Sequence, residues 1–244
     1  MAFRAASAVQ RGIDWGEGIY TLTANINEAK TNFEHKLSQL KDASGADDLI
    51  LCFSCPTRRY FRHDIWPSYK GTRKDMPPLV YRDLKEWASG VWETKTKPNL
   101  EADDVLGILG THPGMVKGEK IIVSHDKDLE QIPGHHMHPE RPYDGVYKVS
   151  LEYGKRQLAM QVLTGDSTDN YPGCPGIGPK RAADILDRVP QGESYIPAIW
   201  AAYEKKGLTQ EAMAVQINTA RILTHTTYNF KTGEPILWEH SPIR

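Results

Sequence analysis

Two short apolar runs, each lying between segments of helical periodicity, limit most strongly how this chain can fold. Residues 48–53 read Asp-Leu-Ile-Leu-Cys-Phe, and residues 120–124 read Lys-Ile-Ile-Val-Ser. Continuous apolar runs of this length are typical of strands that are covered on both faces. Because strands that alternate with helices form parallel sheets, the sequence predicts an α/β core.

Helical periodicity surrounds these runs and dominates the second half of the chain. The helical segments of the first half are residues 2–10, 27–41, 79–91 and 101–109, with a short helix from Asp126 onward. Those of the second half are residues 151–163, 179–188, 196–206 and 209–223. We therefore expect an α/β core at 1–149 and a helical region at 150–244, packed as one unit. Residues 133–147 are expected to form an irregular loop, and residues 226–244 are expected to be extended or irregular.

Three acidic clusters follow one another along the chain. They are Glu101-Ala-Asp103-Asp104, Asp126-Lys-Asp128 and Asp166-Ser-Thr-Asp169. Asp126 follows the second apolar run with only His125 between them, at the strand edge where open α/β sheets build their sites. Converging carboxylates repel one another unless a cation relieves the repulsion. Each cluster alone could be a solvated helix cap, but the three together favour a metal site.

The ligand type indicates which metal and which chemistry to expect. Oxygen ligands select Mg²⁺ or Mn²⁺ over zinc. Two such ions can activate a water and stabilise the leaving oxygen when a phosphodiester is cleaved. The sequence thus predicts two divalent ions.

A glycine-rich segment at residues 165–181 lies between two predicted helices. Gly173, Gly176 and Gly178 permit backbone conformations that other residues resist. Pro179 fits the first turn of the next helix, and Lys180 and Arg181 follow it. Backbone N–H groups at such a helix start can bind a phosphate without reading a base. The alternative is a helix-turn-helix element that serves packing alone.

A basic and aromatic segment precedes the acidic clusters. The whole chain has a net charge of only −1, yet residues 58–85 are rich in Lys and Arg. We predict a mobile loop or arch at about residues 56–78, in which cations contact phosphates and aromatic rings contact unpaired bases. An ordinary solvated loop is the alternative. The side chains concerned are Arg58, Arg59, Tyr60, Phe61, Arg62, Trp66 and Tyr69.

The remaining features indicate a soluble, cytoplasmic protein without membrane contacts. No apolar run approaches the roughly 20 residues that cross a bilayer, and the start of the chain lacks a signal-peptide pattern. Cys52, Cys55 and Cys174 are an odd, sparse set that fits free thiols in a reducing compartment.

Taken together, these motifs resemble the bacteriophage and bacterial 5′→3′ exonuclease and flap endonuclease family. That family is related to the 5′-nuclease domain of bacterial DNA polymerase I. The resemblance covers nearly the whole chain in the expected order. Its motifs are FRHDIWPSYKGTR at 61–73, EADD at 101–104, SHDKDLEQI at 124–132 and TGDSTDNYPGCPGIGPKRA at 164–182.

The resemblance implies a fold and a set of site residues. The fold is a PIN-like core, with a mixed or mostly parallel sheet flanked by helices, followed by a helix–three-turn–helix element. Lys70, Arg73 and Arg4 match residues that act on the scissile phosphate, and the hairpin glycines match a K⁺ site. The implied ligands of the two divalent ions are Glu101, Asp103, Asp104, Asp126, Asp128, Asp166 and Asp169.

The sequence departs from the family pattern in two places. The family has a buried strand ending in an Asp just upstream of residues that match Ala2 to Arg4, but this sequence starts at Met1. Cys55 stands where the family has an Asp at the end of the second strand, and a thiol is a poor ligand for Mg²⁺. Both positions belong to the ion near Glu101 and Asp103. We therefore expect reduced cleavage, retained DNA binding and rescue by Mn²⁺.

The sequence predicts a structure-specific 5′ nuclease for DNA with 5′ ends, flaps or branches. We expect a monomer, in the host cytoplasm if a phage encodes it. One alternative is a catalytically impaired module that binds branched DNA. A PIN-type ribonuclease is the other, but the glycine hairpin argues against it because it is suited to duplex DNA.

Overall fold

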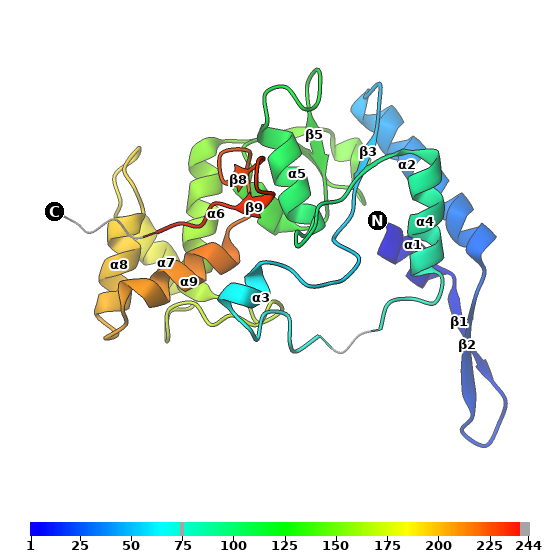
Figure 1. Ribbon diagram of the computed structural model, residues 1–244, viewed down its shortest axis with the longest axis horizontal. Helices are drawn as coiled ribbons and strands as arrows, with labels where there is room; N and C mark the ends of the chain where they lie inside the picture. Colours follow the sequence, from blue (N-terminus) through cyan, green and yellow to red (C-terminus); the bar gives the residue numbers. More distant parts are fainter. Residues whose placement is uncertain (74–75, 240–244) are drawn as a thin grey trace.

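The computed structural model describes residues 1–73 and 76–239, and short strands at its centre are flanked by helices (Figure 1). The helices are α1 (Ala2–Ala8), α2 (Ile26–Ser44), α3 (Arg62–Ile65), α4 (Tyr81–Val91), α5 (Ala102–Thr111), α6 (Leu151–Thr164), α7 (Pro179–Leu186), α8 (Ile196–Glu204) and α9 (Gln210–Ala220), with 3₁₀ turns η1 (Lys127–Gln131) and η2 (Pro142–Asp144). The strands are β1 (Gln10–Asp14), β2 (Tyr20–Ala24), β3 (Ile50–Cys52), β4 (Glu93–Lys95), β5 (Ile121–Val123), β6 (Gly134–Met137), β7 (Tyr147–Val149), β8 (Tyr228–Asn229) and β9 (Glu234–Pro235).

Both apolar runs form strands, and each pairs in parallel with a neighbour. β3 pairs with β4, with Leu51 opposite Thr94. β5 pairs with β6, with Ile122 opposite His136, and β7 then adds to β6 in the antiparallel sense. The expected α/β class with a mixed sheet is confirmed, although the described strands form separate small sheets rather than one.

Helix α2 shows how the local sequence sets these elements. The Asn25 side chain accepts hydrogen bonds from the backbone N–H groups of Asn27 and Glu28, which caps the helix start. Gly45 ends the helix in the left-handed conformation, with φ of 66°. Between them, the buried face of α2 packs with α1 and α4 in a core cluster on one side of the molecule.

A second core cluster joins the helical region to the first half of the chain. Helices α6 to α9 pack together at the opposite end of the molecule from α1, α2 and α4 (Figure 1). Tyr60 and Tyr69, which precede α4 in the chain, are buried within this helical cluster. The two halves therefore share a core, and the boundary near residue 149 stays a prediction. None of the described helices is both long and apolar enough to cross a membrane.

Some sequence predictions were wrong at the level of elements. Residues 133–147 were expected to be irregular, but β6 and the start of β7 lie there. The hairpin β1–β2 was not predicted, and it projects from the body beyond α1 (Figure 1). The expected loop at 56–78 contains the short helix α3. Residues 74–75 of that loop and 240–244 of the expected irregular tail lie outside the described residues.

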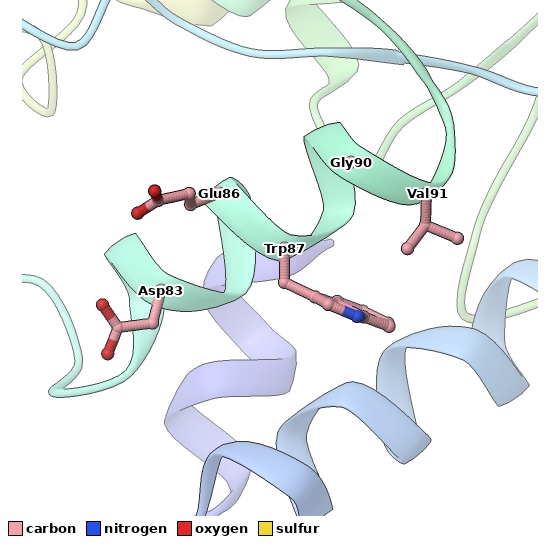
Figure 2. A pocket seen from close by; sticks show the side chains of 5 residues that line it. All are labelled: Asp83, Glu86, Trp87, Gly90 and Val91. Atoms are coloured by element: carbon pink, nitrogen blue, oxygen red, sulfur yellow. The ribbon is translucent and has the colours of Figure 1, made fainter.

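A shallow hollow on the outside of α4 is separate from the acidic clusters. It has a volume of about 410 Å³, and all of its lining residues lie on one helix (Figure 2). Trp87 forms part of its wall, and the Lys30 ammonium lies 5.2 Å from the centre of that ring. Because none of the carboxylates of the three clusters reaches it, this hollow is not the candidate site.

Candidate functional site

The first acidic cluster lies at the start of α5, next to the end of β3. Glu101 is the residue before the helix, and Asp104 completes a capping box with it. The backbone N–H of Ala102 donates to the Ser54 hydroxyl at 3.0 Å, which ties the helix start to the chain leaving β3. Glu101 and Asp104 are buried, at 5% and 0% exposed.

Arg62 is the buried counter-ion of this cluster. Its guanidinium donates to Glu101 Oε2 at 3.0 Å and to the two oxygens of Asp104 at 2.7 and 2.8 Å. It also donates to the carbonyls of Thr219 and Arg221, at 2.9 and 2.7 Å. Although burial alone would lower the pKa of Arg62, its carboxylate neighbours raise it above the usual value. Arg62, which the sequence assigns to DNA binding, is only 3% exposed and faces these carboxylates.

Tyr69 joins the first acidic cluster to the third. Its hydroxyl oxygen lies 2.8 Å from Glu101 Oε2 and 2.8 Å from Asp169 Oδ2. Burial, followed by the repulsion of these carboxylates, raises the pKa of Tyr69, so the phenol stays protonated. Tyr69, which the sequence assigns to DNA binding, is only 4% exposed. Tyr60 and Phe61, the expected base platforms beside it, are 9% and 6% exposed and pack inside the protein.

Lys70 and Arg73 lie at the rim of the same site. The Lys70 ammonium contacts Glu101 Oε1 and lies 3.6 Å from Asp169 Oδ2. Arg73 Nη2 donates to Asp169 Oδ1 at 2.5 Å, and the Arg73 side chain is 44% exposed. The two cations that the resemblance assigns to the scissile phosphate are therefore paired with carboxylates in the protein alone.

The other carboxylates lack such partners. Within residues 1–73 and 76–239, no Lys or Arg forms an ion pair with Asp103, Asp126, Asp128 or Asp166. Burial, and then repulsion from Glu101 and Asp126, raises the pKa of Asp103 to about 7.

The second and third acidic clusters influence each other in the same way. Burial, and then repulsion from Asp126 and Asp166, raises the pKa of Asp128 to about 6. Asp126 Oδ1 accepts from the backbone N–H of Asp128 at 2.9 Å, and Asp166 Oδ1 accepts from that of Thr168 at 2.6 Å. All three clusters thus lie within electrostatic reach of one another.

This donor set fits a hard divalent cation in its chemistry. The available ligands are carboxylate oxygens with an excess of negative charge, which suits Mg²⁺ or Mn²⁺. In the described part of the chain, however, no three Asp, Glu, His or Cys side chains lie close enough to form a ready-made ligand set. The pairing of Glu101 and Asp169 with Lys70, Arg73 and Tyr69 is a physical reason for this, because it fixes those carboxylates on the protein.

Two further residues that the sequence placed near the site lie outside this group. Arg4 on α1 is exposed, and its Nη1 lies 3.4 Å from Glu140 Oε1 rather than beside a predicted ligand. The Cys55 thiol lies 3.2 Å from the Thr57 hydroxyl. The cysteine that interacts with the acidic cluster is Cys52, at the end of β3. Burial, and then repulsion from Asp103, raises the pKa of the Cys52 thiol to about 12.

The glycine segment forms a tight turn between α6 and α7. Gly173 has φ of 63°, and a Cβ there would lie 2.2 Å from the backbone nitrogen of Gly165. Its N–H donates to Gln216 Oε1 at 2.9 Å. Gly173, which the sequence assigns to DNA binding, is buried, and the close approach of the two backbones requires a glycine here.

The outer part of the turn is open to a ligand. Gly176 and Gly178 are exposed, as are Lys180 and Arg181 on the first turn of α7. Lys206, after α8, reaches the same surface, because its Nζ lies 3.3 Å from the position of a Cβ on Gly176. No sequence pattern indicated a role for Lys206, because it is distant from the turn along the chain.

The loop arginines Arg58 and Arg59 are both exposed. Arg59 Nη2 contacts Asp64 Oδ1, and both of these side chains are more than half exposed. The two arginines stay available to a phosphate backbone, unlike Arg62.

Comparisons with known proteins relate this geometry to a family. A family model described as the N-terminal, resolvase-like domain of 5′-3′ exonucleases matches residues 1–159. The chain is 27% identical over 236 residues to flap endonuclease Xni of Shewanella pealeana, which covers 88% of this chain and 90% of that protein. It is 29% identical over 190 residues to DNA polymerase I of Rhizobium leguminosarum, covering 72% of this chain but only 18% of the polymerase.

Solved structures share the fold. A bacteriophage T5 5′-exonuclease with bound divalent metal ions (zinc) superposes with a TM-score of 0.57 at 18% identity, covering 78% of this chain and 80% of that one. A complex of the T5 flap endonuclease with DNA and metal ions gives 0.53 at 17% identity, covering 77% of this chain and 80% of the other. At this level of identity the likeness concerns the fold alone.

Proposed function

The chain belongs to the 5′-3′ exonuclease family, and from this premise we propose that it is a structure-specific 5′ nuclease that hydrolyses DNA phosphodiesters at 5′ ends, flaps and branches. One observation supports this most directly. The Tyr69 hydroxyl lies 2.8 Å from carboxylates of both Glu101 and Asp169, so acidic clusters far apart in the chain meet at one place. Such a concentration of carboxylates is suited to divalent metal ions.

The residues at this place have separate roles in the proposal. Glu101, Asp103, Asp126, Asp128, Asp166 and Asp169 would hold two Mg²⁺ or Mn²⁺ ions. Ions at such a site lower the pKa of a bound water and offset charge on phosphate oxygens. We leave Asp104 out of the ligand set, because both of its oxygens accept hydrogen bonds from Arg62, and also from the backbone N–H groups of Glu101 and Leu223.

Lys70 and Arg73 would act on the substrate after an exchange of partners. In the protein alone they neutralise Glu101 and Asp169. Divalent cations would neutralise those carboxylates when bound, and the two side chains would then be free to bind the scissile phosphate and stabilise the charge that develops on it. Arg4, which lies on α1 beside Glu140, is proposed as a third contact to the phosphate on the family resemblance alone.

DNA binding is assigned to two exposed surfaces. The first is the turn between α6 and α7, where Gly176, Gly178, Lys180 and Arg181 would hold a duplex by its backbone. The second is the loop with Arg58 and Arg59. K⁺ at the turn, a monomeric state and a cytoplasmic location remain parts of this proposal.

A second candidate function is a module that binds branched DNA but cuts it poorly. One observation favours it: the described carboxylates do not form a ready-made ligand set. The thiol of Cys55, in place of an expected carboxylate, would weaken one metal position further. Rescue by Mn²⁺ would follow from this weakness.

A 5′-labelled flap duplex distinguishes these functions. Binding and cleavage are measured in parallel with Mg²⁺, Mn²⁺ or EDTA, for the parent protein and for Asp126→Asn. Cleavage that needs metal and is lost in Asp126→Asn, with binding retained, supports the nuclease. Asp42→Asn, an exposed carboxylate on α2, is the matched control and should cut normally. Binding without cleavage in either metal supports the module, and cleavage of single-stranded RNA alone supports a ribonuclease.

A further inference from the structure

The segment that carries Lys70 is attached to the turn that carries Asp169. Trp66 Nε1 donates to the carbonyl of Asn170 at 2.7 Å, and Asn170 Nδ2 donates to the carbonyl of Ser68 at 2.7 Å. The backbone N–H of Lys70 donates to the carbonyl of Asp169 at 2.8 Å. These three hydrogen bonds, here called the clasp, join two segments that are far apart in the chain, since Ser68 and Asn170 are separated by 102 positions.

The clasp does not depend on the charges of the cations that it holds in place. Its three bonds use backbone groups, an indole N–H and a neutral amide. The Lys70 ammonium and the Arg73 guanidinium pair separately with Glu101 and Asp169. When those ion pairs are broken, the clasp therefore still holds the backbone of Lys70 beside Asp169.

The backbone on both sides of the clasp has a conformation that needs support. Lys70 has φ of 54° and Asn170 has φ of 59°. Residues other than glycine seldom adopt this left-handed conformation, and asparagine tolerates it better than lysine does. It persists where the surrounding contacts determine it. The clasp supplies such contacts at Lys70, whose neighbours Ser68 and Asp169 are both held by it.

We propose that Trp66 and Asn170 are positioning residues for Lys70 and Arg73, and this inference rests on the proposed nuclease function. The clasp keeps the backbone of the basic segment beside the carboxylates, so the two cations stay within reach of a substrate phosphate after their ion pairs open. Trp66 thus uses its N–H inside the protein, rather than its ring on an unpaired base. In the protein without DNA, the same attachment keeps Lys70 in contact with Glu101.

Two variants of the full chain each remove one bond of the clasp. Trp66→Phe keeps an aromatic ring and loses the N–H donor. Asn170→Gly loses the amide donor, and glycine adopts a φ of 59° without strain. The matched controls are Trp200→Phe, a ring that packs against the same core cluster as Trp66, and Asn99→Gly, an exposed asparagine with φ of 56°.

Hydrogen exchange of the Lys70 amide, followed by NMR without metal, tests the clasp itself. We expect this exchange to become at least about tenfold faster in each clasp variant, because opening of the segment no longer breaks all three bonds. Amides of α2 report global unfolding, and their exchange should change by less than about twofold. Both control variants should exchange like the parent protein at Lys70.

Two further measurements test the positioning role. On a 5′-labelled flap duplex with Mg²⁺, each clasp variant should lose about tenfold in kcat, with KM within about twofold of the parent, because the proposed DNA-binding surfaces lie elsewhere. Titration of Mn²⁺ into the DNA-free protein should show about threefold tighter binding, since a less well placed Lys70 competes less for Glu101. A residue that only supported the fold would not tighten metal binding.

Unchanged exchange at Lys70 in both clasp variants would overturn the proposal. Faster exchange with an unchanged kcat would overturn the positioning role, and so would weaker Mn²⁺ binding, because Asn170 would then support the carboxylate turn instead. If the parent protein binds the flap duplex without cutting it, the nuclease proposal fails. The exchange rates and the Mn²⁺ titration still decide whether the clasp holds Lys70, so the two failures are distinguishable.

Discussion

Lys70 illustrates at the scale of a residue how a basic group can oppose metal binding before it assists catalysis. It contacts Glu101 and lies near Asp169, and although burial lowers its pKa, these carboxylates raise it above the usual value, so it stays charged. A cation that binds there must displace it. We predict that Lys70→Met tightens Mn²⁺ binding in the absence of DNA by about fivefold, from removal of about 1 kcal/mol of ion pairing.

The same variant should lose cleavage, because the phosphate contact is gone. Calorimetric titration of Mn²⁺ into the DNA-free protein measures the affinity. Lys180→Met, the same change at the exposed turn, should leave the affinity unaltered. Weaker Mn²⁺ binding by Lys70→Met would show that Lys70 supports the metal site rather than competing for it.

Arg62 differs from Lys70, because it stabilises the fold by neutralising buried carboxylates. Its removal would leave Asp104 and Glu101 without their main counter-ion in a site that is almost closed to water. Breaking a buried pair on one side typically costs about 3–5 kcal/mol, so Arg62→Met should lower the free energy of unfolding by that amount. Urea denaturation measures it. Arg59→Met, which removes an exposed pair with Asp64, should cost less than about 1 kcal/mol.

At the scale of an element, the turn between α6 and α7 contains glycines of two kinds. Gly173 has positive φ and no room for a side chain, whereas a Cβ on Gly178 would meet no atom within 4 Å. We predict that Gly173→Ala destabilises the protein by at least about 1–3 kcal/mol from backbone strain alone. Gly178→Ala should leave the melting temperature almost unchanged. Similar melting temperatures for the two variants would contradict this account of the turn.

The sequence predicted elements well where a single periodicity dominated. The helical segments matching α2 and α4 to α9 were found because their apolar residues recur at helical spacing, and β3 and β5 because they are short apolar runs. β6 was not predicted, because Gly134-His-His-Met137 has no apolar pattern. This segment forms a strand through its backbone pairing with β5 and β7, which is a tertiary contact rather than a property of the local sequence.

The candidate site was predicted in part, for a related reason. The Tyr69 hydroxyl joins the first and third acidic clusters, and the second cluster lies within electrostatic reach of both. Arg62 and Tyr69 were assigned to DNA because they lie in a basic, aromatic segment. Composition cannot distinguish a cation that faces a phosphate from one that neutralises a buried carboxylate, and only the contact with Asp104, 42 residues away, settles it.

At the scale of the whole molecule, protons and metal ions should compete for the acidic site and change the stability. The pKa of Asp103 is raised from 3.8 to about 7 and that of Asp128 to about 6. A raised pKa means that the folded protein holds protons that the unfolded chain has released. The stability gained in this way is full below about pH 4 and is lost as the pH rises through about 7.

We therefore predict that, in EDTA, the parent protein loses stability relative to Asp103→Asn as the pH rises from about 5 to about 8. The two proteins are compared at equal pH because His136 also makes the stability depend on pH. Burial lowers the pKa of His136, so this residue destabilises the folded protein as the pH falls below its usual value of 6.5. Mg²⁺ or Mn²⁺ replaces the lost protons, so either ion should raise the melting temperature of the parent more at about pH 8 than at about pH 5. Thermal melts of both proteins, with metal and with EDTA, measure this. A metal effect that is equal at both pH values, or equal in Asp103→Asn and the parent, would mean that the ions do not bind where these carboxylates meet.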